Sequence, residues 1–185
     1  MLRQVIRSVT FRRDGYLRAV LGNRGVADGV VIVAAVYLAL ALTIGSRGIG
    51  DLVGHARFVL NGGFAWLIIT GLLYLITRHG LRGEGSFQGV LATTALAHPV
   101  LLLLAIAQVG DPIPLALFAH PTLLATEVFR LEFLAGVGVV VATAWFLAIL
   151  TAGARIAMSL PLERAALAVG GSYVAWWLVG TIFGF

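Results

Sequence analysis

His98 and Pro99 are the residues with the clearest capacity for chemistry, because they lie near the middle of an apolar stretch, residues 87–109. A proline inside a helix removes one backbone donor and bends the axis, which frees a carbonyl oxygen. An ionisable side chain at that depth is a candidate for proton transfer or ligand binding. We favour a structural role, in which a neutral His98 bonds to a freed carbonyl or to Thr93 or Thr94. A functional role for His98 stays open.

The other residues that could bind a metal or act in catalysis are dispersed. His55, His79 and His120 fall in predicted loops, so no second histidine at the depth of His98 completes a pair of haem ligands. The absence of cysteine excludes disulfides, thiolate metal ligands and cysteine nucleophiles. The serines lack matching histidine and carboxylate partners, and no phosphate-binding glycine motif occurs. The sequence therefore predicts no metal site, no cofactor and no enzymatic activity.

Arg155 and Glu163 are two further candidate polar sites, and they flank Pro161 in a predicted turn. Pro161 disfavours one unbroken helix through this region. Arg155 lies near a membrane boundary, from which its long side chain can reach the lipid headgroups. The alternative is an ion pair with Glu163 that holds the turn, and we favour the headgroup interpretation.

Five apolar stretches must position these residues. Each has about 20 residues, which at a rise of ~1.5 Å per residue crosses a hydrocarbon core of ~30 Å. A mean hydropathy of +1.00 excludes a soluble protein, because so apolar a surface would aggregate. The predicted fold is all-α, a polytopic bundle of five transmembrane helices after an amphipathic N-terminal segment. The expected spans are residues 26–44, 58–77, 87–109, 133–154 and 165–183, within a transmembrane domain of residues 26–185.

Residues 1–25 are expected to form the basic amphipathic segment. Apolar residues recur there at helical spacing and Asp14-Gly15 interrupts them, so we expect two short helices at the membrane interface. Six arginines against one aspartate favour anionic headgroups of the cytoplasmic leaflet, with partner docking as the alternative. No arginine run alternates with aromatic residues, so no nucleic acid is expected as a partner. The apolar positions are Leu2, Val5, Ile6 and Val9, and the lipid-surface arginines are Arg3, Arg7, Arg12, Arg13 and Arg18.

The arginines outside the spans predict the orientation. Six precede the first span, two follow the second and two follow the fourth, which places ten on the side of the N-terminus. Only Arg47, Arg57 and Arg130 fall on the opposite side. Cytoplasmic loops are enriched in basic residues. We therefore expect a multi-pass protein of the cell membrane, with the N-terminus in the cytoplasm and the C-terminus outside.

Glycines mark places where helices can approach closely. Asn61-Gly62-Gly63 opens the second span, and Gly170-Gly171 lies in the fifth. Small residues allow transmembrane backbones to come together. We favour packing within one bundle, and a homo-oligomer is the alternative.

Two segments carry a resemblance to a known family. The first is Gly-Glu-Gly-Ser-Phe-Gln at residues 83–88, which enters the third span ahead of Pro99. The second begins at Trp145, eight residues before Gly153. It continues with Ala157, Ser159-Leu160 and Arg164-Ala165. Together they resemble the Yip family of Rab/Ypt-interacting membrane proteins, in its prokaryotic branch. The resemblance implies a five-helix bundle without known catalysis, linked in eukaryotic members to vesicle traffic and membrane shaping.

The expected function is a non-catalytic scaffold that organises the membrane or binds a membrane-protein partner. One alternative is a small transporter or channel, and another is an accessory subunit of a larger membrane complex. A transporter needs polar groups along a path, and the spans offer few. These are His98, Thr93, Thr94, Gln108 and Thr143.

Overall fold

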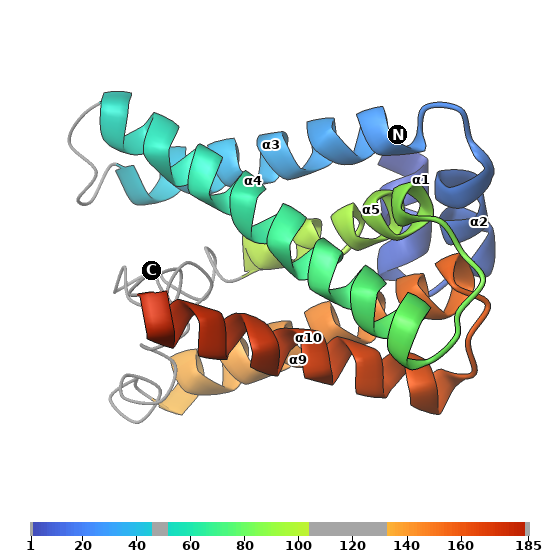
Figure 1. The fold of residues 1–185 in the computed structure, drawn as a ribbon. Coiled ribbons are helices and arrows are strands. Elements are labelled where there is room, and N and C mark those ends of the chain that lie inside the picture. The colour runs from blue at the N-terminus through green and yellow to red at the C-terminus, as the bar shows by residue number, and fades with distance from the viewer. Residues whose placement is uncertain (1, 46–51, 104–132, 184–185) are drawn as a thin grey trace.

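The computed structural model describes residues 2–45, 52–103 and 133–183, and its regular elements in these ranges are helical (Figure 1). Gln108, His120, Arg47, Arg130 and residues 104–109 of the predicted third span lie outside the described residues. Two short helices precede five apolar helical segments. The elements are α1 (Leu2–Val9), α2 (Arg13–Leu21), α3 (Gly25–Gly45), α4 (Leu52–Leu75) with the π-turn η1 (Ile76–Gly80), α5 (Phe87–Ala95) with the 3-10 turn η2 (His98–Val100), α9 (Phe133–Ala157) and α10 (Leu162–Phe183).

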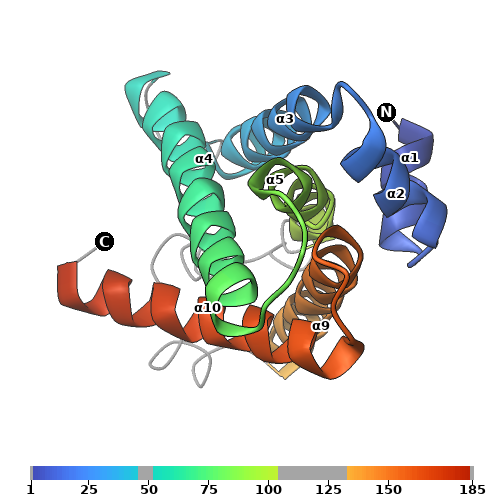
Figure 2. The same ribbon diagram turned by 45° about the vertical axis from the view of Figure 1, so that its right-hand side comes forward.

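Helix α5 lies at the centre of the molecule. It packs against α2, α3, α4 and α9, and Figure 2 shows it enclosed by the longer helices. Residues 89–98 are all buried, so this segment has no face toward lipid or solvent. Such a helix needs apolar or small residues on every side, and Gly-Val-Leu-Ala-Thr-Thr-Ala at 89–95 meets that need.

The outward faces of the surrounding helices are apolar. Large hydrophobic side chains are exposed along α3, α4, α9 and α10, which is the reverse of a soluble protein and is typical of a surface in contact with lipid. Examples are Val31, Leu42, Phe64, Val140 and Leu167. The all-α fold and the membrane class are therefore confirmed.

Three helices in the described ranges are long and apolar enough to cross a membrane: Gly25–Thr43, Leu52–Gly80 and Val137–Ala157. Phe87–Leu103 is a shorter apolar helix. The count of five spans therefore stays a prediction. Helix α4, which contains the second predicted span, begins at Leu52, ahead of the predicted start at residue 58. A helix satisfies its own backbone groups and can therefore continue beyond the apolar stretch.

The N-terminal segment forms a helical hairpin, α1–α2, but its break differs from the prediction. Residues 10–12 separate the helices, and Phe11 adopts a left-handed conformation with φ 59° while the Arg12 amide bonds back to the Arg7 carbonyl. Asp14 and Gly15 lie in the first turn of α2. A β-carbon at Gly15 would lie only 2.7 Å from the Ser8 hydroxyl oxygen. Gly15 thus permits the close contact of the two helices and does not interrupt them.

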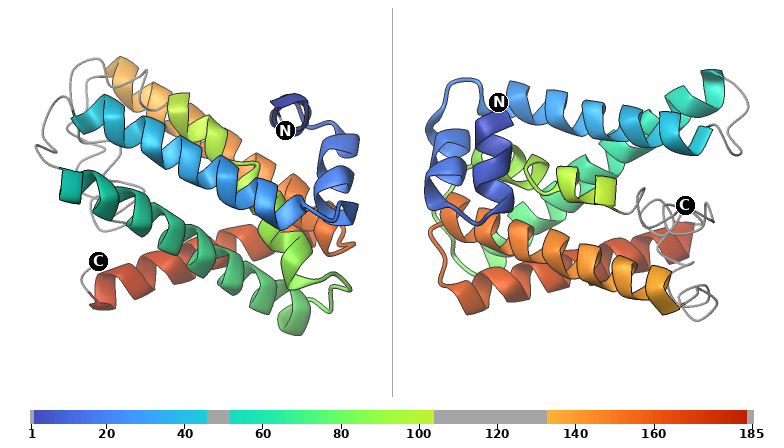
Figure 3. Two further views of the ribbon diagram at one scale, coloured as in Figure 1. Left: turned by 90° about the horizontal axis from the view of Figure 1, so that it is seen from above. Right: turned by 180° about the vertical axis from the view of Figure 1, so that it is seen from behind.

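The arginine-bearing elements gather at one end of the bundle. Figure 3 shows the α1–α2 hairpin at the same end as η1 and the α9–α10 turn. The backbone amide of Glu84 bonds to the Met158 carbonyl at 3.1 Å, which ties the η1–α5 connection to that turn. The start of α4 and the end of α10 lie at the opposite end (Figure 1).

Candidate functional site

The helix that carries His98 changes its winding ahead of Pro99. α5 ends at Ala95, η2 is a 3-10 turn, and α-helix resumes at residues 101–103. The ring Nδ1 of His98 lies 3.2 Å from the Thr94 carbonyl oxygen. Because a carbonyl only accepts, this hydrogen bond requires the proton on Nδ1. The expected contact of His98 with a backbone carbonyl is present.

Three helices enclose the His98 ring, which is 4% exposed. Tyr37 of α3, Trp66 of α4 and Phe146 of α9 have ring centroids 5.9, 6.2 and 5.7 Å from that of His98. The rings are tilted or edge-on to the imidazole, the arrangement that aromatic quadrupoles favour. His98 therefore lies where α3, α4, α5 and α9 meet.

Thr94 connects the same cluster by hydrogen bonds. Its hydroxyl lies 3.1 Å from the Leu91 carbonyl, to which it donates its only proton. The Trp66 indole N–H donates to the Thr94 hydroxyl at 2.9 Å, and the Thr70 hydroxyl lies at the same distance. With the Thr94 proton assigned to the Leu91 carbonyl, Thr70 is the donor in this pair as well. Both lone pairs of the Thr94 oxygen are then occupied, and the polar atoms are satisfied inside an apolar core.

This His98–Thr94 cluster was predicted only in part. The sequence singled out His98, Pro99, Thr93 and Thr94, whereas their partners on other helices were missed. Trp66 and Thr70 are spaced i, i+4, which places them on one face of α4, and this spacing was the available signal.

The cluster has no metal-binding character. Among the described residues, no three or more His, Cys, Asp or Glu side chains come together to hold a metal ion. His55 and His79 lie in α4 and η1, which corrects the expectation that both are in loops. The reason is that both helical segments extend beyond the apolar stretch from which the span was predicted.

The two segments that resemble a known family pack against each other. A β-carbon at Gly85 would overlap the Ala157 carbonyl, and one at Gly83 would lie 3.0 Å from the Met158 methyl carbon. Ser86 caps α5 by accepting a hydrogen bond from the Gly89 amide at 3.1 Å. The glycines of residues 83–88 are thus explained by the close approach of this segment to the end of α9.

The family model of the Yip1 domain matches residues 7–184. The chain belongs to the Yip family. No curated protein and no solved structure matches the chain significantly. The match covers the end of α1 and all of α2 as well as the apolar helices, so this Yip-family protein is a multi-pass membrane protein whose family domain begins within the hairpin.

Arg155 and Glu163 lie on either side of the α9–α10 turn in this Yip-family protein. Ser159 has φ 53°, and the Leu160 amide bonds to the Arg155 carbonyl at 3.1 Å, which closes the end of α9 ahead of Pro161. Both charged side chains are exposed, and the structure shows no salt bridge between them. The salt bridge found within the described ranges joins Arg7 to Asp14 in the hairpin. The ion-pair interpretation of Arg155 is therefore not supported.

One hydrogen bond joins the hairpin to α9, and a second, buried one joins the two helices of the hairpin to each other. The Trp145 indole N–H donates to the Val9 carbonyl at 3.1 Å, and the Tyr16 hydroxyl donates to the Ser8 carbonyl at 2.7 Å. Burial raises the pKa of Tyr16 well above its usual range, so the hydroxyl remains a donor. Five of the six N-terminal arginines are exposed, namely Arg3, Arg12, Arg13, Arg18 and Arg24.

Proposed function

We propose that this Yip-family protein is a non-catalytic scaffold that organises the membrane by binding anionic lipid headgroups at its cytoplasmic face. The observation that carries the proposal is the docked hairpin, which packs Val5 and Val9 against the core and leaves four arginines exposed, with a fifth, Arg24, exposed directly after it. Each basic residue near an anionic surface contributes about 1 kcal/mol, so five act together as a strong electrostatic anchor. The rigid bundle determines where that anchor lies.

The proposed orientation is N-terminus in the cytoplasm and C-terminus outside, in the cell membrane. It is supported by the position of the hairpin, η1 and the α9–α10 turn at one end of the bundle (Figure 3). These elements and their connections contain all ten arginines that the positive-inside rule assigns to the cytoplasm.

The His98–Thr94 cluster supports a scaffold more than a transporter. A conducting path needs polar groups that can exchange partners with a solute or a proton. Here Thr94 uses its proton and both lone pairs within the protein, and three aromatic rings enclose His98. This cluster holds α4 and α5 together, and a membrane-protein partner or a second copy would bind elsewhere on the bundle.

The test is lipid-dependent stability of the full-length protein in detergent, followed by the fluorescence of its four tryptophans. We expect phosphatidylglycerol to raise the unfolding midpoint more than phosphatidylcholine does. Raising the salt to about 1 M should remove most of this difference, because the Debye length falls from ~10 Å at 0.1 M to ~3 Å.

A triple variant, Arg3→Gln, Arg12→Gln and Arg18→Gln, should lose most of the preference for phosphatidylglycerol. Arg57→Gln is the matched control, because Arg57 is also exposed but lies near the start of α4 at the opposite end. Equal stabilisation of the wild type by both lipids, or an unchanged preference in the triple variant, would overturn the proposal.

A further inference from the structure

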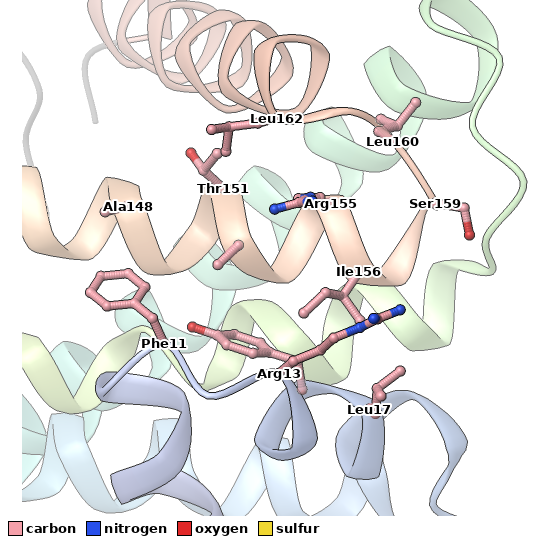
Figure 4. Close-up of a pocket in the computed structure, with 12 residues that line it drawn as sticks. Phe11, Arg13, Leu17, Ala148, Thr151, Arg155, Ile156, Ser159, Leu160 and Leu162 are labelled. Carbon is pink, nitrogen blue, oxygen red and sulfur yellow. The ribbon is translucent and has the colours of Figure 1, made fainter.

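A groove separates the hairpin from the end of α9. Its volume is about 740 Å³, within the range of small-molecule binding sites, ~300–1,000 Å³. In Figure 4, Phe11, Arg13 and Leu17 form one wall, and Thr151, Arg155 and Ile156 of α9 form the other, with Leu162 of α10 above them. The groove lies at the arginine-rich end of the bundle, where the proposed orientation puts the headgroups.

The charges of the groove are unbalanced. Arg13 of α2 and Arg155 of α9 both line it, both are exposed, and neither makes a hydrogen bond or salt bridge within the described part of the chain. Among the residues that the structure describes, no aspartate or glutamate lines the groove. Two positive charges in one groove repel each other, and a bound anion attracts both. Guanidinium groups bind phosphate oxygens in bidentate geometry, which favours phosphate among the available anions.

The remaining lining is mostly apolar. Phe11 and Leu162 are 50% and 53% exposed, and Leu17, Ala148 and Ile156 extend the apolar surface along both walls. A free inorganic anion makes no use of such a surface. An anionic amphiphile does, because its phosphate and its hydrocarbon chain match the two kinds of lining.

We propose that this groove binds one anionic phospholipid, with its phosphate between Arg13 and Arg155 and an acyl chain against Phe11, Ile156 and Leu162. The site rests on the proposed function and deepens it, since it adds one stoichiometric lipid to the diffuse attraction of the hairpin. The bound lipid joins the hairpin to the end of α9 through charge, beyond the hydrogen bond that Trp145 already makes to Val9.

The experiment counts lipids on the full-length, detergent-purified protein by native mass spectrometry. Phosphatidylglycerol should bind the wild type with a strong first site, and phosphatidylcholine should not. Arg13→Gln and Arg155→Gln should each weaken this first site by about tenfold or more, since a hydrogen bond to a charged group is lost. Arg57→Gln is the control and should bind as the wild type does.

Ala148→Trp separates a phospholipid from free phosphate as the occupant. Ala148 is exposed in the groove, so a bulky side chain fits without disturbing the core but fills the place of the acyl chain. We expect this variant to lose the first phosphatidylglycerol site. Unchanged phosphatidylglycerol binding in the variant, together with its displacement by millimolar inorganic phosphate, would overturn the proposal in favour of a phosphate site.

The test of the groove site can fail while the test of the proposed function succeeds, because the two use different arginines. The triple variant of Arg3, Arg12 and Arg18 should lose the salt-sensitive lipid preference and retain the first phosphatidylglycerol site. If Arg13→Gln and Arg155→Gln both bind phosphatidylglycerol as the wild type does, the groove site is wrong while the role of the hairpin stands on its own test.

Discussion

At the centre of the bundle, the hydroxyl of Thr94 makes the hydrogen bonds that join α4 to α5. Thr94 receives hydrogen bonds from Trp66 and Thr70 of another helix and donates to a carbonyl of its own. Its backbone carbonyl accepts a hydrogen bond from the Nδ1–H of His98. Water cannot replace a lost partner in an apolar interior. If one of these groups is removed, the others stay buried without a hydrogen bond, which destabilises the fold.

We therefore expect Thr94→Val to destabilise the protein by roughly 1–3 kcal/mol, because valine keeps the shape but leaves the donors of Trp66 and Thr70 unpaired. Thermal unfolding in detergent, followed by tryptophan fluorescence, measures the effect. Thr77→Val is the matched control. Thr77 is equally buried, and among the described residues its hydroxyl bonds the carbonyls of Leu73 and Tyr74, which belong to its own helical segment. Similar losses in the two variants would show that the inter-helix bonds contribute nothing special.

Among the elements, the contact of α3 with α4 depends on one glycine. A β-carbon at Gly62 would overlap the ring of Tyr37, the same ring that contacts His98 and lies 5.9 Å from that of Phe58. A β-carbon at the neighbouring Gly63, or at Gly71 or Gly170, would have no other described residue within 4 Å outside its own helix backbone. Gly62 therefore has the expected role in packing within the bundle. A homo-oligomer that packs through the other glycines stays a prediction.

Gly62→Ala should lower the unfolding midpoint, because overpacking of a close helix contact costs about 1–3 kcal/mol. Gly63→Ala changes the same helix one position away and should leave the midpoint unchanged or raise it slightly, since alanine is the better helix former. Thermal denaturation of the two variants in parallel tests whether the contact of Gly62 with Tyr37 stabilises the bundle. A loss at Gly63 as large as that at Gly62 would refute the contact and would favour an oligomer through that face.

For the whole molecule, the decisive property is which end faces the cytoplasm. Ten arginines belong to one end, and an orientation that places them outside would oppose the positive-inside rule. The absence of cysteine makes each introduced cysteine unique, so single positions can be assigned to a side of the membrane.

We expect Leu21→Cys to react with a membrane-impermeant maleimide in right-side-out vesicles only after permeabilisation. Leu52→Cys should react without it. Both positions are well exposed, at 77% and 86%, and they lie at opposite ends of the bundle, so accessibility within the protein is matched. The opposite pattern would invert the orientation. Reaction of both positions from one side would overturn the arrangement of the first two spans.

The sequence alone was enough to predict that this protein lies in a membrane, that its fold is helical, which family it belongs to, and that His98 is buried beside a break at Pro99. These follow from local properties: hydropathy over a span, the missing amide of proline, and the two short segments that resemble the Yip family. The boundary error at Leu52 has a local cause too, because hydropathy reports where lipid begins and not where a helix ends. The error at Asp14-Gly15 has a tertiary cause, because Gly15 is explained by its close approach to Ser8.

Only the tertiary structure decided which residues meet. It placed Trp66, Thr70 and Tyr37 around His98 and Thr94, joined residues 83–88 to the end of α9, and set Arg155 in one groove with Arg13, with no bond to Glu163. It also docked the hairpin on Trp145, with Val5 and Val9 packed against the core while Ile6 and most of the N-terminal arginines stay exposed. These contacts join residues distant in the chain, and they depend on how helices pack, which no local pattern of polarity specifies.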